Sequence, residues 1–158
     1  MDILFRTEEY VFSYRVAGIC VRNGKVLLQK PVGDTAFAFP GGHAAFGETN
    51  AQTLAREFRE ELGAEISVGE LKWVGEIFFP WGGKPCHQIC LYYAAEILSD
   101  DIPSDGIFAG TERVNGEVRL EFHWVPLEKL GEIELYPTNA AEFMRKTECG
   151  VQHFIYRE

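Results

Sequence analysis

Residues 50–62 carry a helical pattern that limits how the rest of the chain can fold. On a helical wheel of 3.6 residues per turn, the apolar side chains of this segment form one stripe. The stripe consists of Ala51, Leu54, Ala55, Phe58 and Leu62. Gly63 follows and predicts a C-cap. An apolar stripe of this kind must be buried against another layer of structure.

The segments around this helix are rich in strand-forming residues. Asn23-Gly24 lies between two β-rich runs and predicts a hairpin with a turn of the primed type. Further strands are predicted at 64–69, 71–79, 87–97 and 119–125, with a turn at 80–85 and a long polar loop at 98–118. Pro126 opens a short helix, and a second amphipathic helix is predicted at 138–148. This order predicts an α+β fold, in which a mixed β-sheet is flanked by helices.

Length and charge restrict the class of protein. A chain of 158 residues with 46% hydrophobic residues predicts one domain, residues 1–158, with a substantial core. The formal net charge of −9 argues against binding to nucleic acid or to a membrane surface. No apolar run is long enough to span a bilayer, and the charged start does not resemble a signal peptide. The expectation is a cytoplasmic protein, either a monomer or a homodimer.

The four cysteines are expected to be reduced, buried thiols. They are Cys20, Cys86, Cys90 and Cys149. A structural zinc site would need a tighter Cys/His cluster than "CHQIC" offers. Free cysteine is among the residues most often buried in a core.

Three glutamates lie beside the apolar stripe of the helix. Glu57, Glu60 and Glu61 share an arc of about 100° on the wheel. Like charges so placed destabilise a helix by about 0.2–0.5 kcal/mol per pair. Taken alone, the cluster is either a solvated acidic face or a binding site for a divalent cation. Arg56 precedes Glu60 by four residues and is placed to pair with it.

The surroundings of these glutamates resemble a known motif. The sequence "GGHAAFGETNAQTLAREFREELGA" contains G-x5-E-x7-R-E-U-x-E-E-x-G-U, where U is apolar, and this pattern is the Nudix box of the MutT-like Nudix hydrolases. The seven fixed positions match at Gly42, Glu48, Arg56, Glu57, Glu60, Glu61 and Gly63. Phe58 and Ala64 stand where Ile, Leu or Val is usual, which affects packing only. The resemblance extends over about residues 14–148.

This resemblance implies a fold and a reaction. The family has an α/β/α sandwich and hydrolyses a pyrophosphate bond in nucleoside diphosphate derivatives or nucleoside triphosphates, using Mg²⁺ or Mn²⁺. By this resemblance, Glu57, Glu60 and Glu61 are the catalytic, metal-binding residues, and the backbone carbonyl of Gly42 contacts the metal. Glu48 and Arg56 brace the motif. The alternative is a non-catalytic Nudix-like nucleotide sensor, against which the intact glutamates argue.

The sequence gives weaker indications outside the motif. Many family members add a carboxylate from a later loop, and here Glu117 is the first choice and Glu121 the second. The loop at 98–118 is expected to border the substrate cleft and to close over it. A small nucleotide-type substrate would be bound by Arg15, Phe78 and Trp81. Other candidate contacts are Lys30, His43, Phe79, Lys84 and Tyr136.

Overall fold

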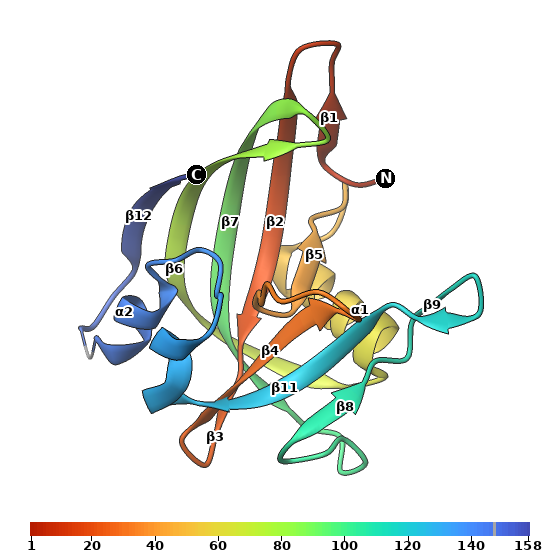
Figure 1. Ribbon diagram of the computed structural model, residues 1–158, viewed down its shortest axis with the longest axis vertical. Helices are drawn as coiled ribbons and strands as arrows, with labels where there is room; N and C mark the ends of the chain where they lie inside the picture. Colours follow the sequence, from red (N-terminus) through yellow and green to blue (C-terminus); the bar gives the residue numbers. More distant parts are fainter. Residues whose placement is uncertain (147) are drawn as a thin grey trace.

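The computed structural model describes residues 1–146 and 148–158. Its larger sheet contains six strands, in the order β1-β2-β7-β6-β12 with β5 beside β2 (Figure 1). These strands are β1 (Leu4–Arg6), β2 (Val11–Ile19), β5 (Gly41–His43), β6 (Ile66–Trp81), β7 (Lys84–Ile97) and β12 (Gln152–Arg157). The pairs β2–β7 and β6–β12 are parallel and the others are antiparallel, so the predicted mixed sheet is confirmed.

A smaller sheet lies beside the first, and side chains of both sheets contribute to each of the two hydrophobic clusters of the core. Its order is β3-β4-β11-β8. Its strands are β3 (Val21–Arg22), β4 (Lys25–Pro31), β8 (Ile107–Ala109) and β11 (Leu120–Pro126). A separate two-stranded ribbon, β9 (Arg113–Val114) and β10 (Glu117–Val118), extends away from the body of the molecule, as Figure 1 shows.

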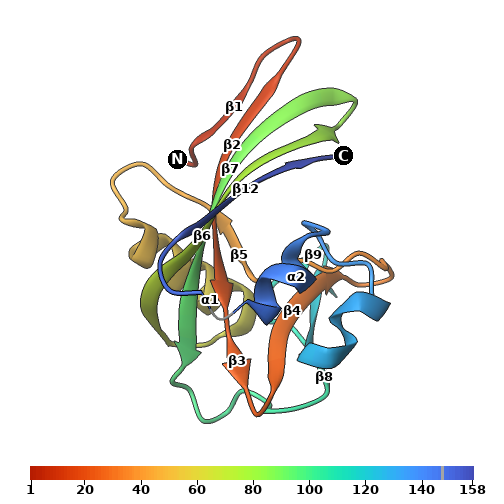
Figure 2. The ribbon, with the colours of Figure 1, turned by 90° about the vertical axis from the view of Figure 1, so that its left-hand side faces the viewer.

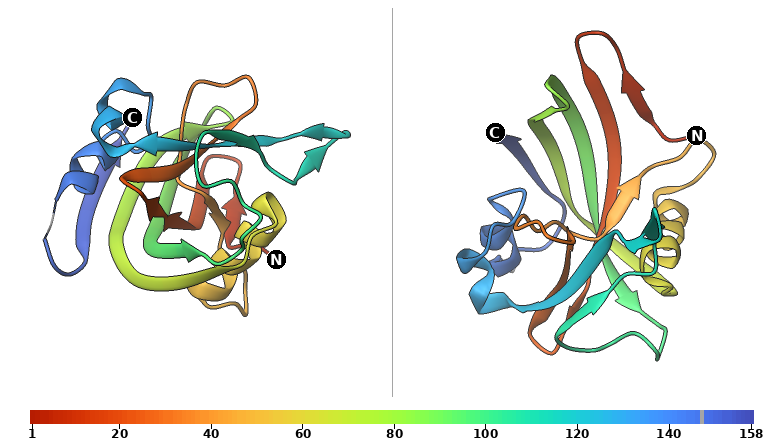
Figure 3. Two further views of the ribbon diagram at one scale, coloured as in Figure 1. Left: turned by 90° about the horizontal axis from the view of Figure 1, so that it is seen from below. Right: turned by 45° about the vertical axis from the view of Figure 1, so that its right-hand side comes forward.

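The helices lie on opposite sides of the larger sheet. Helix α1 (Asn50–Leu62) is on one side, and the 3-10 helix η1 (Leu127–Glu132) and helix α2 (Ala140–Arg145) are on the other (Figures 2 and 3). The predicted α+β fold is therefore confirmed. The second predicted helix is shorter than expected, because Lys146 is already extended. Thr147, which that prediction included, lies outside the described residues.

Helix α1 has the predicted bounds, and both of its ends are capped. The Thr49 side chain accepts a hydrogen bond from the Gln52 amide while Gln52 reaches back to the Thr49 amide, which is a capping box. Gly63 adopts the left-handed conformation with φ 69°. The buried stripe of Leu54, Phe58 and Leu62 packs in a cluster with side chains of both sheets. These contacts fix the rotation of α1, and therefore fix where its glutamates point.

Other expectations meet mixed outcomes. The Asn23-Gly24 hairpin is confirmed, with positive φ at both residues. The two strands expected at 64–69 and 71–79 are one strand, β6, with irregular register between Val68 and Trp73. The expected loop at 98–118 contains β8 and the β9–β10 ribbon. Its turn is Asn115-Gly116, again with positive φ at both residues, so the same hairpin signal was present in the sequence.

Two remaining expectations concern the cysteines and the membrane. Cys20, Cys86 and Cys90 are buried free thiols as predicted, but Cys149 is exposed, so the prediction was wrong for that residue. In the part of the chain that the structure describes, no helix is both long and apolar enough to cross a bilayer.

Candidate active site

A cavity of about 390 Å³ opens where α1, β5 and the smaller sheet meet. The three glutamates of the Nudix-like motif all line it, together with Gly42. The other charged and polar side chains on its wall are Asp2, Arg15, Gln29, Lys30, His43, Glu112 and Arg119. The strongly mixed charge of this wall suits a cavity that holds both a cation and an anion.

Glu57 lies against the backbone of strand β5. A Cβ atom added to Gly42 would stand 2.2 Å from the Glu57 carboxyl carbon, so any other residue at this position would force the Glu57 carboxylate to move. The Glu57 side chain is only 14% exposed and accepts a hydrogen bond of 2.7 Å from Arg56 Nη1. Burial raises the pKa of this carboxyl group, and the Arg56 guanidinium partly opposes that shift.

Glu61 is the most deeply buried of the three carboxylates, with 4% of its surface exposed. One oxygen accepts a hydrogen bond of 2.7 Å from Arg119 Nη2. The other oxygen is buried without any hydrogen-bond partner. Burial and then the nearby Glu57 charge raise the pKa of Glu61 to about 7. A buried carboxylate oxygen without a partner is rare, and a bound cation would satisfy it.

Glu60 is more exposed, and Arg56 connects it to the rest of the motif. The Glu60 side chain is 58% exposed and lies 3.4 Å from Arg56 Nη1, which is the pairing that the sequence spacing predicted. Arg56 also donates to both oxygens of Glu48, with Nε 3.0 Å from Oε1. Thr53 donates a further hydrogen bond of 2.8 Å to Glu48. These contacts hold the loop before α1 against the helix.

The donor set of this cavity suits a hard divalent cation such as Mg²⁺, which prefers carboxylate and carbonyl oxygens. Among residues 1–146 and 148–158, however, no three acidic, imidazole or thiol side chains are already drawn together as a finished metal site. Arg56 pairs with Glu57, and Arg119 pairs with Glu61. The three box glutamates line one cavity and do not form such a cluster in the part of the chain that the structure describes.

The structure does not bring either predicted outer carboxylate to the glutamates. Glu117 is exposed on the β9–β10 ribbon, because the Asn115-Gly116 turn directs this segment into solvent. Glu121 is opposite Lys30 in the sheet and pairs with both Lys30 and His123. Glu112 lines the cavity instead.

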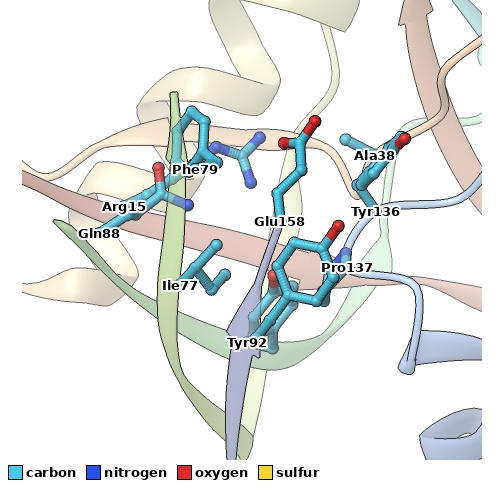
Figure 4. A pocket seen from close by; sticks show the side chains of 10 residues that line it. Arg15, Ala38, Ile77, Phe79, Gln88, Tyr92, Tyr136, Pro137 and Glu158 are labelled. Atoms are coloured by element: carbon cyan, nitrogen blue, oxygen red, sulfur yellow. The ribbon is translucent and has the colours of Figure 1, made fainter. Parts of the chain in front are cut away.

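A second cavity of about 410 Å³ adjoins the first and shares Arg15 and Ala38 with it. Aromatic and aliphatic side chains form its walls, and the polar groups of Arg15, Gln88 and Glu158 surround it, as Figure 4 shows. The remaining lining residues are Ile77, Phe79, Tyr92, Tyr136, Pro137 and Tyr156. This arrangement of apolar walls with a few polar groups is typical of a small-molecule pocket.

Of the predicted aromatic contacts, Phe78 is not part of this pocket. Side chains alternate along a strand, so Phe79 faces the pocket and Phe78 faces the opposite side of the sheet. There the ring of Phe78 lies 4.4 Å from that of His87, and the Arg157 guanidinium is 4.0 Å above it. Lys84 does not line this pocket either, and its ammonium group donates to the Thr7 carbonyl oxygen.

Trp81 is not a lining residue of the first cavity, but its ring stacks on His43, which is one. The two rings are stacked, with centroids 5.7 Å apart and planes 13° from parallel. The guanidinium of Arg6, a residue of β1, lies 4.5 Å from the centroid of the Trp81 ring. Burial, followed by the positive charge of Arg15, lowers the pKa of His43, so its imidazole is neutral at pH 7.

Comparison with known proteins identifies the family. The family described as the NUDIX domain matches residues 13–147. The chain belongs to the NUDIX family. The predicted recognition of a Nudix hydrolase is thereby confirmed, whereas the extent of the domain over residues 1–158 stays a prediction.

Individual relatives agree with this assignment. The CTP pyrophosphohydrolase of Escherichia coli (strain K12) is 49% identical over 59 residues, which are 35% of this chain and 44% of that protein. The nucleoside triphosphatase NudI of Enterobacter sp. (strain 638) is 27% identical over 139 residues, which are 83% and 94% of the two chains. The crystal structure of MutT from Bacillus halodurans superposes with a TM-score of 0.58 at 20% identity, covering 92% of this chain and 90% of that one. This last likeness shows the Nudix fold alone.

Proposed function

We propose that this NUDIX-family protein is a metal-dependent pyrophosphohydrolase. It would cleave a pyrophosphate bond in a nucleoside triphosphate or a nucleoside diphosphate derivative by attack of water on phosphorus. The observation that carries the proposal is the cavity that Gly42, Glu57, Glu60 and Glu61 line together, in which one buried Glu61 oxygen has no partner. The names of the relatives, a CTP pyrophosphohydrolase and a nucleoside triphosphatase, support the reaction class.

The proposed roles follow from position and chemistry. Glu57, Glu60 and Glu61, with the backbone carbonyl of Gly42, would hold Mg²⁺ or Mn²⁺. When bound, such an ion neutralises negative charge on the phosphates and provides a polarised water. Glu48, through its contacts with Arg56, keeps the loop before the helix in place.

The two adjoining cavities suggest how a nucleotide would lie. Lys30 and Arg15 supply positive charge beside the glutamates, so they would contact the phosphates. Arg15 belongs to both cavities, and it is held in place by hydrogen bonds to the Phe39 and Gly41 carbonyl oxygens. A planar base would then enter the second cavity, against Phe79 and Tyr136.

A substrate panel tests this proposal. The purified protein would be incubated with Mg²⁺ and with CTP, the other nucleoside triphosphates, ADP-ribose and nucleotide sugars, and the released phosphate, pyrophosphate and nucleotides would be measured. Glu61→Gln should lose turnover, while Glu70→Gln, an exposed glutamate on β6, should not. Binding of a nucleotide without any turnover across the panel would instead support a sensor.

A further inference from the structure

Arg119 lies between two acidic side chains at the edge of the glutamate cavity. Its Nη2 atom donates to Glu61 Oε1 at 2.7 Å. Its Nε atom is 2.6 Å from the buried Oε2 atom of Glu112, in a charge contact whose angle does not make a hydrogen bond. Arg119 therefore pairs directly with one box glutamate and with Glu112, which lines the cavity from the β8–β9 connection, while the charge of Arg15 on the same wall also favours ionised Glu61.

The backbone fixes this arrangement. The Thr111 amide donates to the Glu61 carbonyl oxygen at 2.8 Å, and the Thr111 hydroxyl donates to the Glu60 carbonyl oxygen at 3.0 Å. The Arg119 amide donates to the Glu112 carbonyl oxygen at 3.2 Å. Hydrogen bonds thus hold the base of the β9–β10 ribbon against the last turn of α1. Glu112 and Arg119 are held beside Glu61 although the tip of the ribbon extends into solvent (Figure 1).

We propose that Arg119 is an internal counter-cation of the active site, which a divalent metal ion must displace, and that Glu112 is the carboxylate outside the Nudix box that helps to hold this ion. The inference rests on the proposed function. A guanidinium paired with two carboxylates occupies the acidic groups that an incoming cation needs. The second Glu61 oxygen, which is buried and has no partner, shows that Arg119 satisfies this acidic site only in part.

The exposure of Arg119 allows such a displacement. Its side chain is 44% exposed, so it can turn into solvent when its partners change, whereas Glu61 cannot leave the cavity. Arg113 provides a matched control on the same ribbon. It carries the same charge, but it donates to the backbone carbonyl oxygens of Gly110 and Glu112. Loss of Arg113 therefore changes net charge without freeing an acidic group in the cavity.

The first test is Mn²⁺ binding to the metal-free full-length chain, measured from the electron paramagnetic resonance signal of free Mn²⁺. Arg119→Met should bind Mn²⁺ at least about fivefold more tightly than the wild type, which corresponds to about 1 kcal/mol. Arg113→Met should stay within about twofold of the wild type. Arg119→Lys keeps the charge and should remain nearer to the wild type than Arg119→Met. Equal affinities of Arg119→Met and Arg113→Met would overturn the role of Arg119.

The second test separates Glu112 from Glu117. In the Arg119→Met background, Glu112→Gln should weaken Mn²⁺ binding by about fivefold, since a direct contact is lost whether or not Arg119 is present. Glu117→Gln in the same background should leave the affinity within about twofold. Equal affinities of these two double variants would overturn the role of Glu112.

The same titration distinguishes this inference from the proposed function. Glu61→Gln should abolish the tight Mn²⁺ site of the otherwise unchanged chain. If the wild type does not bind Mn²⁺, or if Glu61→Gln binds it equally well, the proposed function fails and this inference fails with it. If that binding is present but the Arg119 and Arg113 variants do not differ, only the inference fails. Thermal melts of each variant verify that it is folded.

Discussion

The buried Glu61 carboxylate should make the metal-free protein less stable as the pH rises. Burial, and then the charge of Glu57, raise its pKa from 4.5 to about 7 in the folded chain. Between these two values the folded state keeps a proton that the unfolded state has already released. The folded state therefore binds more protons, and the free energy of unfolding falls as the pH rises through this window.

The magnitude follows from the size of the pKa shift. Each pKa unit corresponds to about 1.36 kcal/mol, so a shift from 4.5 to about 7 amounts to about 3 kcal/mol when the window has been crossed. Repulsion between exposed glutamates on a helix would give only about 0.2–0.5 kcal/mol per pair. The burial of Glu61, which the sequence pattern does not reveal, thus contributes more than the repulsion that the pattern does reveal.

Urea unfolding in the presence of a chelator, at several values from about pH 5 to about pH 8, measures this effect. The wild type should lose about 2.5 kcal/mol over that range relative to Glu61→Gln, which has no charge to bury at this position. Glu60→Gln is the matched control, because its side chain is on the same helix but mostly exposed. Parallel pH curves for the wild type and Glu61→Gln would refute the reasoning. Saturating Mn²⁺ at the upper pH should restore stability, by about 2.7 kcal/mol at one hundred times its Kd.

Three other variants test the packing around the site. Gly42→Ala would place a methyl group against the Glu57 carboxylate, so Mn²⁺ affinity measured by titration should fall at least about tenfold, and unchanged affinity would contradict the close approach. Phe58→Ala removes a fully buried ring under the helix and should lower the free energy of unfolding in urea by about 3–5 kcal/mol; a loss below about 1 kcal/mol would show that the stripe of α1 is not the core contact. Phe79→Ala should raise KM for the best nucleotide of the panel while Phe78→Ala does not, and the opposite order would move the base to the other face of the sheet.

The helix and its glutamates could be predicted because the information is local. The apolar stripe, the C-cap at Gly63 and the motif spacing all lie within residues 42–64, and they agree with one another. The pairing of Arg56 with Glu60 follows from helical spacing alone and is present. The burial of Glu61 is different, because it depends on the ribbon base and on Arg119, which are about fifty residues further along the chain.

The outer parts of the site could not be assigned so directly. Glu117 and Glu112 are five positions apart in one polar segment, and only the folded hairpin decides which of them meets the cavity. The Asn115-Gly116 pair signalled that hairpin, yet its strands are two residues long and show no alternating pattern. Phe78 and Phe79 are adjacent on β6 and both are aromatic. The sequence therefore does not say which of the two side chains is on the face of the sheet that lines the pocket. The parallel pairing of β12 with β6 depends on tertiary contact rather than on any turn signal.

The turnover of two single variants tests the central claim most directly. In the presence of saturating Mg²⁺ and the best substrate from the panel, kcat would be measured for the wild type, Glu60→Gln, Glu61→Gln and the exposed control Glu70→Gln. Each Gln variant keeps the shape of the side chain and removes a charge that the proposed metal ion requires. If the box glutamates hold that ion, kcat should fall by at least about 100-fold in the first two variants, which corresponds to about 2.7 kcal/mol, and should stay near the wild-type value in the control. Wild-type turnover in both Glu60→Gln and Glu61→Gln, with folded proteins, would contradict the account.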